Sequence, residues 1–208
     1  MFGAGTLTFQ EFMSGETLPL ATIHDAVLDH LRGVDDAVLF GAYAVNAYVP
    51  GPRMTPVIDL LSPRAPEVAE RLRAFLADHF HIAVRVREVA SGRGHRVYQV
   101  RQEGNRHLVD VQSVTTMPAA RRIAGVLVLE PVELIAMKVT AYESRRAQPK
   151  AGTDWRDIAE LLLAFPELNR EEGPVADRLR SSGADEATFG TWRGLVAQEI
   201  RSSDEDEL

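Results

Sequence analysis

Residues 39–61, LFGAYAVNAYVPGPRMTPVIDLL, decide the fold of this chain. The stretch opens with a short apolar run that meets Gly41, continues as a short helix predicted over 42–49, and breaks at the turn residues PGPR. A second apolar run, 57–61, contains a single acid, Asp59. Apolar runs of this length, bounded by glycine and proline, are typical of buried strands. The stretch therefore predicts a strand, a glycine turn, a short helix and a second buried strand.

The rest of the chain divides into a mixed part and a helical part. Apolar residues recur at helical spacing over 18–31 and again from Ser62-Pro63 through His79. This spacing predicts one helix before the first strand and another after the second strand. Alternating polar and apolar residues predict an antiparallel meander with one solvated face. The three meander strands are expected over 84–89, 96–101 and 107–112, and a further strand over 123–129.

From residue 131 onward the pattern predicts helices only. They are expected over 131–146, 154–165, 175–180 and 186–201. The chain is thus predicted to be an α+β protein, with a mixed sheet flanked by helices and a helical C-terminal region. We place the α/β core at 1–120, the helical region at 121–202 and an acidic tail at 203–208.

Composition limits the classes of chemistry available. The 208 residues include no cysteine, which excludes disulfides, thiol catalysis and thiolate zinc sites. A formal net charge of -7 does not indicate a polyanion partner for the chain as a whole, although a local basic cleft stays open as an alternative. No apolar stretch reaches the length of a membrane span, and the N-terminus lacks a basic start followed by an apolar segment. We therefore expect a cytoplasmic protein that does not cross a membrane.

Two acids lie within otherwise apolar strands. Asp59 lies in VIDLL and Asp110 in LVDVQ, and a mixed sheet would place them at neighbouring strand ends. Hard divalent cations such as magnesium bind carboxylate oxygens, and nucleotidyl transfer uses one or two such ions. The arrangement predicts a metal site. The alternatives are a solvated acid at the end of a strand and, for Gly41, a simple tight turn.

The same residues resemble a known family. LFGAYAVNAY followed by RMTPVIDLL resembles the opening of the polymerase-β-like nucleotidyltransferase superfamily, in particular AbiEii-type and related small bacterial nucleotidyltransferases. That opening is a Gly-Gly or Gly-Ser turn followed by Arg-x-Thr-x-Asp-x-Asp. HLVDVQSV resembles the strand that carries the third carboxylate, while VELIAMKVTAYESRR and KAGTDWRDIAELL resemble the downstream helices. The resemblance spans residues 39–163.

For the nucleotide, the resemblance implies four contacts in the opening stretch. Gly41 and its turn would lie against the nucleotide phosphates, where a bare backbone can approach closely. Ala42 replaces the second glycine or serine, so a hydroxyl contact is lost. Arg53 and Thr55 precede the acidic strand, where they would order the site or contact phosphate.

For catalysis, the resemblance implies that Asp59 and Asp110 are the second and third metal carboxylates and would hold Mg²⁺. Val57 stands where the family has its first aspartate. An isopropyl group supplies no oxygen ligand, so the metal motif is degenerate. Loss of one ligand predicts impaired or absent transfer.

Charged residues on the first two C-terminal helices are further candidates. Lys138 and Arg145 share a helix face and could hold a triphosphate together, or they are surface cations with extended stems. The resemblance makes Lys138 the phosphate contact and places a nucleotide-site residue at Asp157. For Asp154 we favour capping of the helix, where an acid suits the helix dipole.

A second feature is a run of basic residues along the meander. It could form a strip for RNA or nucleotide phosphates, or it could simply be a solvated face. Its members are Arg93, His95, Arg96, Arg101 and Arg106.

Three functions follow from these patterns. The first is a nucleotidyltransferase-fold protein that binds a nucleoside triphosphate but has impaired or lost metal-dependent transfer of a nucleotide. The second is an active enzyme that moves a nucleotide to an RNA or protein acceptor. The third is an interaction domain without chemistry. The resemblance to AbiEii-type proteins also implies a toxin–antitoxin role with an antitoxin-like partner.

Overall fold

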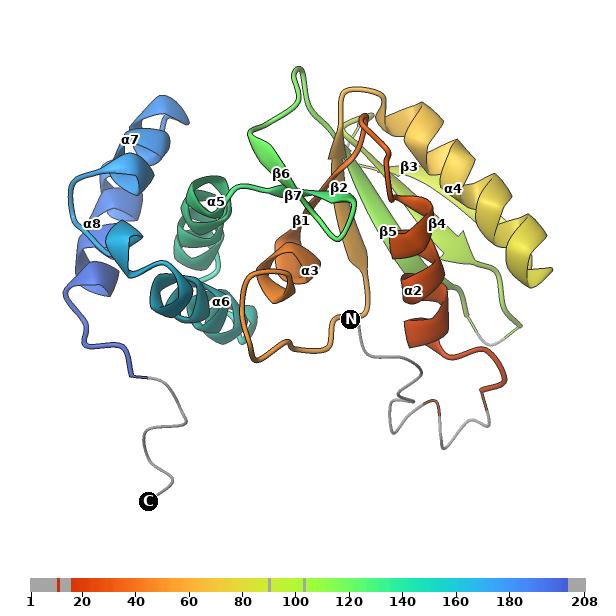
Figure 1. Cartoon of the computed structure of the whole chain (residues 1–208), viewed down its shortest axis with the longest axis horizontal. Coiled ribbons are helices and arrows are strands. Elements are labelled where there is room, and N and C mark those ends of the chain that lie inside the picture. Colours follow the sequence, from red (N-terminus) through yellow and green to blue (C-terminus); the bar gives the residue numbers. More distant parts are fainter. Residues whose placement is uncertain (1–10, 12–15, 90, 103, 202–208) are drawn as a thin grey trace. The chain divides into compact units, whose positions relative to one another are not determined.

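The structure, a computed structural model, describes Glu11 and residues 16–89, 91–102 and 104–201. Its elements are shown in Figure 1. The strands are β1 (Val38–Phe40), β2 (Ile58–Ser62), β3 (Val84–Val89), β4 (Gly94–Gln99), β5 (Arg106–Ser113), β6 (Ala120–Ile123) and β7 (Val126–Leu129). The helices are α2 (Leu20–His30), α3 (Gly41–Asn46), α4 (Ala65–Phe80), α5 (Pro131–Ser144), α6 (Lys150–Ala164), η1 (Pro166–Leu168), α7 (Pro174–Ser181) and α8 (Glu186–Val196).

All seven strands form one mixed sheet in the order β3-β4-β5-β2-β1-β7-β6. The predicted meander is confirmed, since β3 pairs with β4 and β4 with β5 in antiparallel register. β5 then runs parallel to β2, which is antiparallel to β1. Val38, Leu39, Ile58 and Leu60 on the central strands are fully buried. This burial explains why β1 and β2 read as continuous apolar runs.

The far edge of the sheet differs from the prediction of one strand over 123–129. Two strands, β6 and β7, lie there, joined by Ala124 and Gly125 with φ of 49° and 88°. Two successive residues with positive φ make the turn that best matches the twist of a hairpin. Arg32 Nη1 donates to the Ala124 carbonyl at 2.8 Å, and the Gly33 N–H donates to the Gly125 carbonyl at 3.0 Å. Contacts with a distant segment thus stabilise a turn that the sequence did not indicate.

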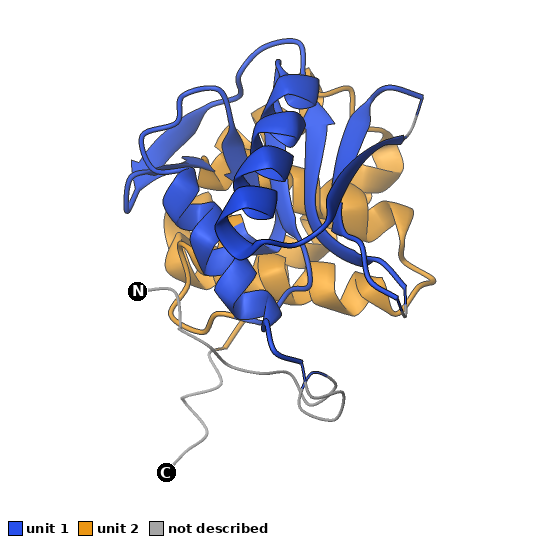
Figure 2. Ribbon diagram, turned by 90° about the vertical axis from the view of Figure 1, so that its right-hand side faces the viewer, with its two compact units in different colours: residues 1–43, 53–128 blue, residues 44–52, 129–208 orange. Residues whose placement is uncertain are grey.

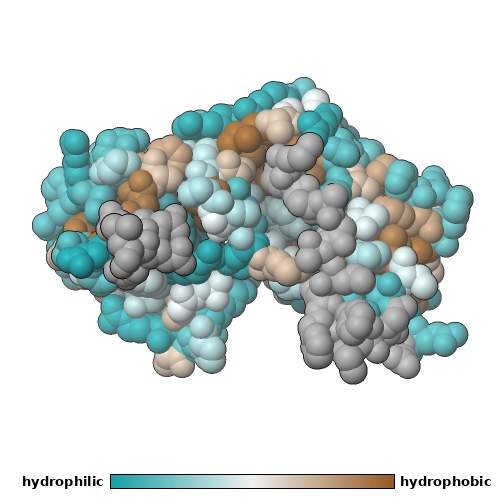
Figure 3. Space-filling model, turned by 60° about the horizontal axis from the view of Figure 1, so that its bottom comes forward, coloured by the Kyte–Doolittle hydropathy of each residue, from teal (hydrophilic) through white to brown (hydrophobic). Residues whose placement is uncertain are grey.

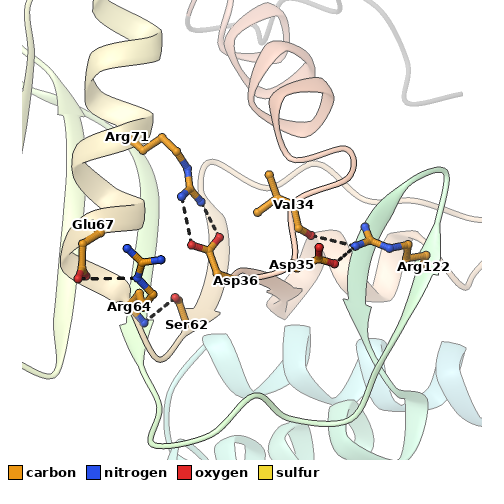
Figure 4. Close-up of polar contacts among 8 residues, drawn as sticks. All are labelled: Val34, Asp35, Asp36, Ser62, Arg64, Glu67, Arg71 and Arg122. Atoms are coloured by element: carbon orange, nitrogen blue, oxygen red, sulfur yellow. Dashed lines mark hydrogen bonds and ion pairs between the residues drawn. The ribbon is translucent and has the colours of Figure 1, made fainter.

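The loop that precedes β1 is held at two points (Figure 4). The Arg71 guanidinium donates to both Asp36 carboxylate oxygens, at 2.7 and 3.1 Å, and lowers the pKa of that carboxyl. On the other side, Arg122 from β6 pairs with Asp35 and donates to the Val34 carbonyl at 3.3 Å. These contacts fix the start of β1, the strand that leads into Gly41.

The chain divides into two compact units, coloured separately in Figure 2. Unit 1 comprises residues 1–43 and 53–128 and contains the sheet. Within it, α4 packs against β2, β3, β4 and β5, and α2 packs against α4 and β5. Unit 1 therefore has helices over one face of its meander.

Unit 2 comprises residues 44–52 and 129–208. Within it, α5 packs against α6, α7 and α8. The short segment 44–52 is tied in by Tyr48, whose hydroxyl donates to the Leu129 carbonyl at 3.0 Å and whose ring meets Phe165 edge to face. Unit 2 is therefore assembled from two separate parts of the chain.

Two of the C-terminal helices, α6 and α8, differ from the predicted bounds by more than two residues at one end. α6 begins at Lys150, directly after Pro149, instead of at Asp154. A proline suits the start of a helix because its fixed φ is helical and its missing N–H is not needed there. α8 ends at Val196 instead of at residue 201. The acidic tail over 203–208 lies outside the described residues.

Large apolar side chains on the surface are few in the described part of the chain: Met54, Met137, Trp155 and Leu163. The face drawn in Figure 3 accordingly shows small hydrophobic patches among hydrophilic residues. Over the same described residues, the helices are too short or too polar to span a bilayer.

Candidate functional site

The two predicted carboxylates are direct neighbours in the sheet. Asp59 on β2 pairs with Asp110 on β5 in parallel register, and its partner on the other side is Phe40, the last residue of β1. Adjacent strands are about 4.8 Å apart, and side chains in register point to the same face. Asp59 lies near the start of its strand, whereas Asp110 lies in the middle of a longer one. The register thus brings together the two acids that the sequence singled out.

Gly41 lies directly against the carboxylate of Asp59. Its φ is +68°, and a Cβ at this position would lie 2.3 Å from Asp59 Oδ2 and 3.0 Å from Cγ. Both the positive φ and the close approach require a residue without a side chain. Ala42, which follows in α3, is buried. The turn between β1 and α3 therefore places backbone without a side chain beside the Asp59 carboxylate.

Val57 directly precedes β2 and lies two residues before Asp59. Ile58 between them is fully buried, while Val57 and Asp59 are both half-buried. The Val57 side chain carries no oxygen, so it cannot act as a ligand beside the two carboxylates. Across the described ranges, no group of three or more acidic or histidine side chains is arranged to hold a metal ion. The candidate metal site thus consists of two carboxylates.

Asp110 already has two polar partners. Its Oδ1 atom lies 3.1 Å from Arg96 Nε and 2.9 Å from His107 Nε2. His107 and Asp110 are three residues apart, so a regular strand would direct them to opposite faces. A bulge opposite Val97 and Tyr98 shifts the register of β5 and brings His107 onto the face of Asp110. This contact could not be predicted, because HLVDV contains no glycine or other local signal of a bulge.

Arg53 and Thr55 lie in the loop that leads into β2. The Thr55 hydroxyl donates to the Val57 carbonyl at 3.3 Å, which turns the chain toward the strand. Arg53 Nη1 donates to the Met54 carbonyl at 3.4 Å, and Met54 itself is 63% exposed. These contacts order the loop locally.

Lys138, Asp154 and Asp157 form a charged cluster in unit 2. Lys138 Nζ lies 3.2 Å from Asp154 Oδ1 and 2.6 Å from Asp157 Oδ2, and Arg145 Nη1 lies 2.9 Å from Asp154 Oδ2. The side chains of both aspartates are at most 2% exposed, and that of Lys138 is 13% exposed. The shared face of Lys138 and Arg145 is confirmed, because both reach Asp154. Two cations and two anions join α5 to α6.

One expectation and one alternative for this cluster were wrong. Asp154 does not cap α6, because the helix begins four residues earlier and the carboxylate is buried and paired. Lys138 is not a surface cation with an extended stem, since its ammonium lies between two buried aspartates. A lone buried carboxylate is costly, so the cluster satisfies each charge with an opposite one.

The basic residues predicted to form a strip along the meander fall into two groups in the structure, one paired with an acid and one exposed. Arg101 Nη2 lies 2.8 Å from Glu16 Oε2, and Arg106 pairs with the same carboxylate. The Arg106 side chain is only 11% exposed, so it serves to hold the segment before α2. Arg93 and Arg96 are exposed on β4 and the turn before it.

A buried histidine–tyrosine pair lies beside the Gly41 turn and was also missed. His24 is 1% exposed, and its Nδ1 lies 2.7 Å from the hydroxyl of Tyr43, two residues beyond Gly41. Burial lowers the pKa of His24 to about 4 and raises the pKa of Tyr43. The signal was the position of His24 on the apolar face of the helix, next to Ile23 and one turn before Val27 and Leu28.

Similarity to known proteins is found by comparison of structures and not by comparison of sequences. No protein-family model matches it, and neither does any curated protein. The polyadenylate synthase of Megavirus is similar at a TM-score of 0.57 and 14% identity, over 71% of this chain and 32% of the viral enzyme. This chain thus spans about a third of that protein.

Two structures from Helicobacter pylori are similar over nearly their whole length. JHP933 has a TM-score of 0.52 at 12% identity, over 92% of this chain and 91% of its own. The other, provisionally described as a nucleotidyltransferase, has a TM-score of 0.53 at 12% identity, over 92% of this chain and 93% of its own. At such low identity the likeness shows the fold. The α+β architecture predicted from the sequence is therefore confirmed, and the chain has a nucleotidyltransferase-like fold.

Proposed function

We propose that this protein binds a nucleoside triphosphate against the Gly41 turn and Asp59, and that its metal-dependent transfer of a nucleotide is impaired or lost. One observation carries the proposal: the pair Asp59–Asp110 lies in register beside Gly41, but Val57 supplies no third carboxylate. The nucleotide contacts inferred for Ala42, Arg53, Thr55, Lys138 and Asp157 belong to the same proposal.

The contacts of Asp110 support the loss of transfer. Mg²⁺ binds near-octahedral oxygen ligands, and in nucleotidyl transfer it orients the α-phosphate and offsets developing charge. Asp59 and Asp110 would hold it here. Arg96 and His107 compete for Asp110 Oδ1, and Val57 removes one ligand altogether. Loss of about 4 kcal/mol of transition-state stabilisation would slow transfer on the order of a thousandfold.

Titration calorimetry with the four nucleoside triphosphates, with and without magnesium, tests the proposal. The parent is compared with Val57→Asp and with Val57→Asn. Asparagine has the shape of aspartate but lacks its charge. We expect triphosphate binding by the parent that magnesium changes little, and magnesium-dependent binding by Val57→Asp alone. If neither the parent nor Val57→Asp binds a triphosphate, the site assignment fails and an interaction domain is the better description.

An active transferase is the second candidate, because two carboxylates in register can still hold one ion. The discriminating assay follows incorporation of α-labelled nucleotide into RNA or protein, by the parent and by Val57→Asp. Incorporation by the parent above the level of an Asp59→Asn variant would establish activity. A toxin–antitoxin role stays a prediction from the resemblance alone.

A further inference from the structure

We propose that the open face of β3 and β4 binds a single-stranded nucleic acid, with one end of the strand directed at Asp110 and Asp59. We call this face the arginine platform and define it by Arg85, Arg87 and Arg96. The inference rests on the proposed function for the role of the bound strand as an acceptor. Binding itself requires neither a metal ion nor a nucleotide.

The strand register aligns the platform with the carboxylates. Arg87 pairs with Arg96, Arg96 with Asp110, and Asp110 with Asp59, so four charged residues form one row across β3, β4, β5 and β2. With about 4.8 Å between strands, the Cα atom of Arg87 lies about 10 Å from that of Asp110. The row passes from two cations to two anions. A polyanion lying along the cations would have its end at the carboxylates.

The platform cations are available for binding. Arg85 and Arg87 are exposed on β3, the edge strand of the sheet, and neither has an ion-pair partner among the residues that the structure describes. The Arg96 side chain is 45% exposed and shares its charge with Asp110. Arg101 and Arg106, by contrast, are paired with Glu16. Among the described arginines of the meander, Arg85 and Arg87 on the edge strand therefore carry the unpaired positive charge.

A cavity of about 400 Å³ adjoins the row on β4 and β5. The polar residues that line it include Arg93, Arg96, Asp110, Gln112 and Ser113. Arginine, amide and hydroxyl groups are the donors that proteins use for phosphate and sugar oxygens. The cavity thus has the size and chemistry for a sugar-phosphate group next to Asp110.

An aromatic side chain favours nucleic acid over a protein acceptor. Tyr98 pairs with Arg85 across β3 and β4, is half-buried, and its ring lies 5.5 Å from that of His107. Proteins that bind single strands combine basic grooves with aromatic faces on which bases stack. Tyr98 beside Arg85 thus offers an aromatic face for a base next to a cation for its phosphate.

Fluorescence anisotropy with a short labelled single-stranded RNA, without magnesium or nucleotide, tests this inference. The double variant Arg85→Ala/Arg87→Ala is compared with Arg64→Ala/Arg73→Ala, which removes the same charge from the surface of α4. We expect the platform variant to bind at least about tenfold more weakly at low salt. Its plot of log affinity against log salt should lose about 1.4 in slope, since each single-strand phosphate contact contributes about 0.7. The control variant should match the parent.

Three results would overturn the inference. The first is a parent that does not bind RNA at low salt, as expected if the acceptor is a protein. The second is equal weakening by both double variants, which would reflect net charge alone. The third is displacement of the RNA by magnesium-free ATP, which would assign the platform to the triphosphate. RNA binding that persists where the calorimetry finds no nucleotide binding would refute the proposed nucleotide site and leave the platform standing.

Discussion

At the scale of single residues, Gly41 combines two independent constraints. Its positive φ disfavours any side chain, and its Cα hydrogen faces the Asp59 carboxylate. Gly33 has a similar φ of +75°, but a Cβ there would meet nothing within 4 Å. Comparing substitutions at the two glycines therefore separates the free-energy cost of the backbone conformation from that of the contact with Asp59.

Gly41→Ala is expected to lower the free energy of unfolding by more than Gly33→Ala. The left-handed conformation costs a non-glycine residue about 1–2 kcal/mol in both variants. Only Gly41→Ala also displaces Asp59, for which we expect a further loss of at least about 1 kcal/mol. Urea unfolding measures the free energy of unfolding of both variants. In the double variant Gly41→Ala/Asp59→Ala, the further loss that comes from displacing Asp59 should be recovered. Equal losses at the two glycines would show that Asp59 is not held against the turn.

His24 makes the stability of the fold depend on pH. Its pKa is about 4 in the folded protein, against 6.5 for an unperturbed histidine, because burial disfavours the charged ring. Between these values the unfolded chain binds more protons than the folded one. Its contribution to stability is therefore intact above pH 6.5 and is lost as the pH falls toward 4.

From pH 7 to pH 4 this group alone should remove about 3 kcal/mol of stability, at about 1.4 kcal/mol per pKa unit. Urea unfolding at the two pH values measures the loss, which should be correspondingly smaller in His24→Gln. His81→Gln, at an exposed histidine, is the matched control and should follow the parent. If His24→Gln keeps the same pH dependence as the parent, the ring titrates normally and is not buried as described.

At the scale of elements, the cluster of Lys138, Arg145, Asp154 and Asp157 stabilises the packing of α5 against α6. Lys138 and Arg145 together neutralise two aspartates whose side chains are almost fully buried. Removal of one partner from a buried ion pair leaves an uncompensated charge and typically costs about 3–5 kcal/mol. Lys138→Met, which keeps the stem and removes the charge, should destabilise the protein by an amount in that range.

The chain contains a natural control for this variant. Lys150 is the other lysine of the sequence and lies exposed at the start of α6. Lys150→Met should leave the midpoint of thermal unfolding nearly unchanged, while Lys138→Met lowers it. Similar midpoints for both variants would mean that the aspartates are solvated. The cluster also means that loss of nucleotide binding in Lys138→Met is informative only if the variant remains folded.

At the scale of the whole molecule, the chain passes between its two compact units three times. Residues 44–52 belong to unit 2, although unit 1 precedes and follows them in sequence. Tyr48 joins this segment to Leu129 and Phe165. The stability of unit 2 therefore depends on residues far from the rest of it in sequence.

Tyr48→Phe should lower the stability of unit 2 by about 1 kcal/mol, because the Leu129 carbonyl loses its hydrogen bond. Hydrogen exchange of the α5 and α6 amides would show the change as faster exchange. Tyr142→Phe, a tyrosine on α5 itself, is the control and should leave exchange unchanged. Unaltered exchange in Tyr48→Phe would indicate that residues 44–52 do not support unit 2.

Local sequence signals were sufficient to predict most of the order of strands and helices and the two acids of the candidate site. Short apolar runs, glycine turns and helical spacing are local signals, so β1, β2 and the meander followed from them. Asp59 and Asp110 stood out because each interrupts an apolar strand. Gly41 stood out because it ends one.

Tertiary structure decided the contacts that set what the site can do. The bulge that brings His107 to Asp110 depends on the pairing of β5 with β4. The hairpin of β6 and β7 depends on Arg32 and Gly33, and the burial of Asp154 depends on the packing of α5 against α6. No local pattern specifies such partners, because register and helix packing are set by the free energy of the whole core. The sequence could therefore identify the carboxylates, but only the packed sheet placed an arginine and a histidine on one of them.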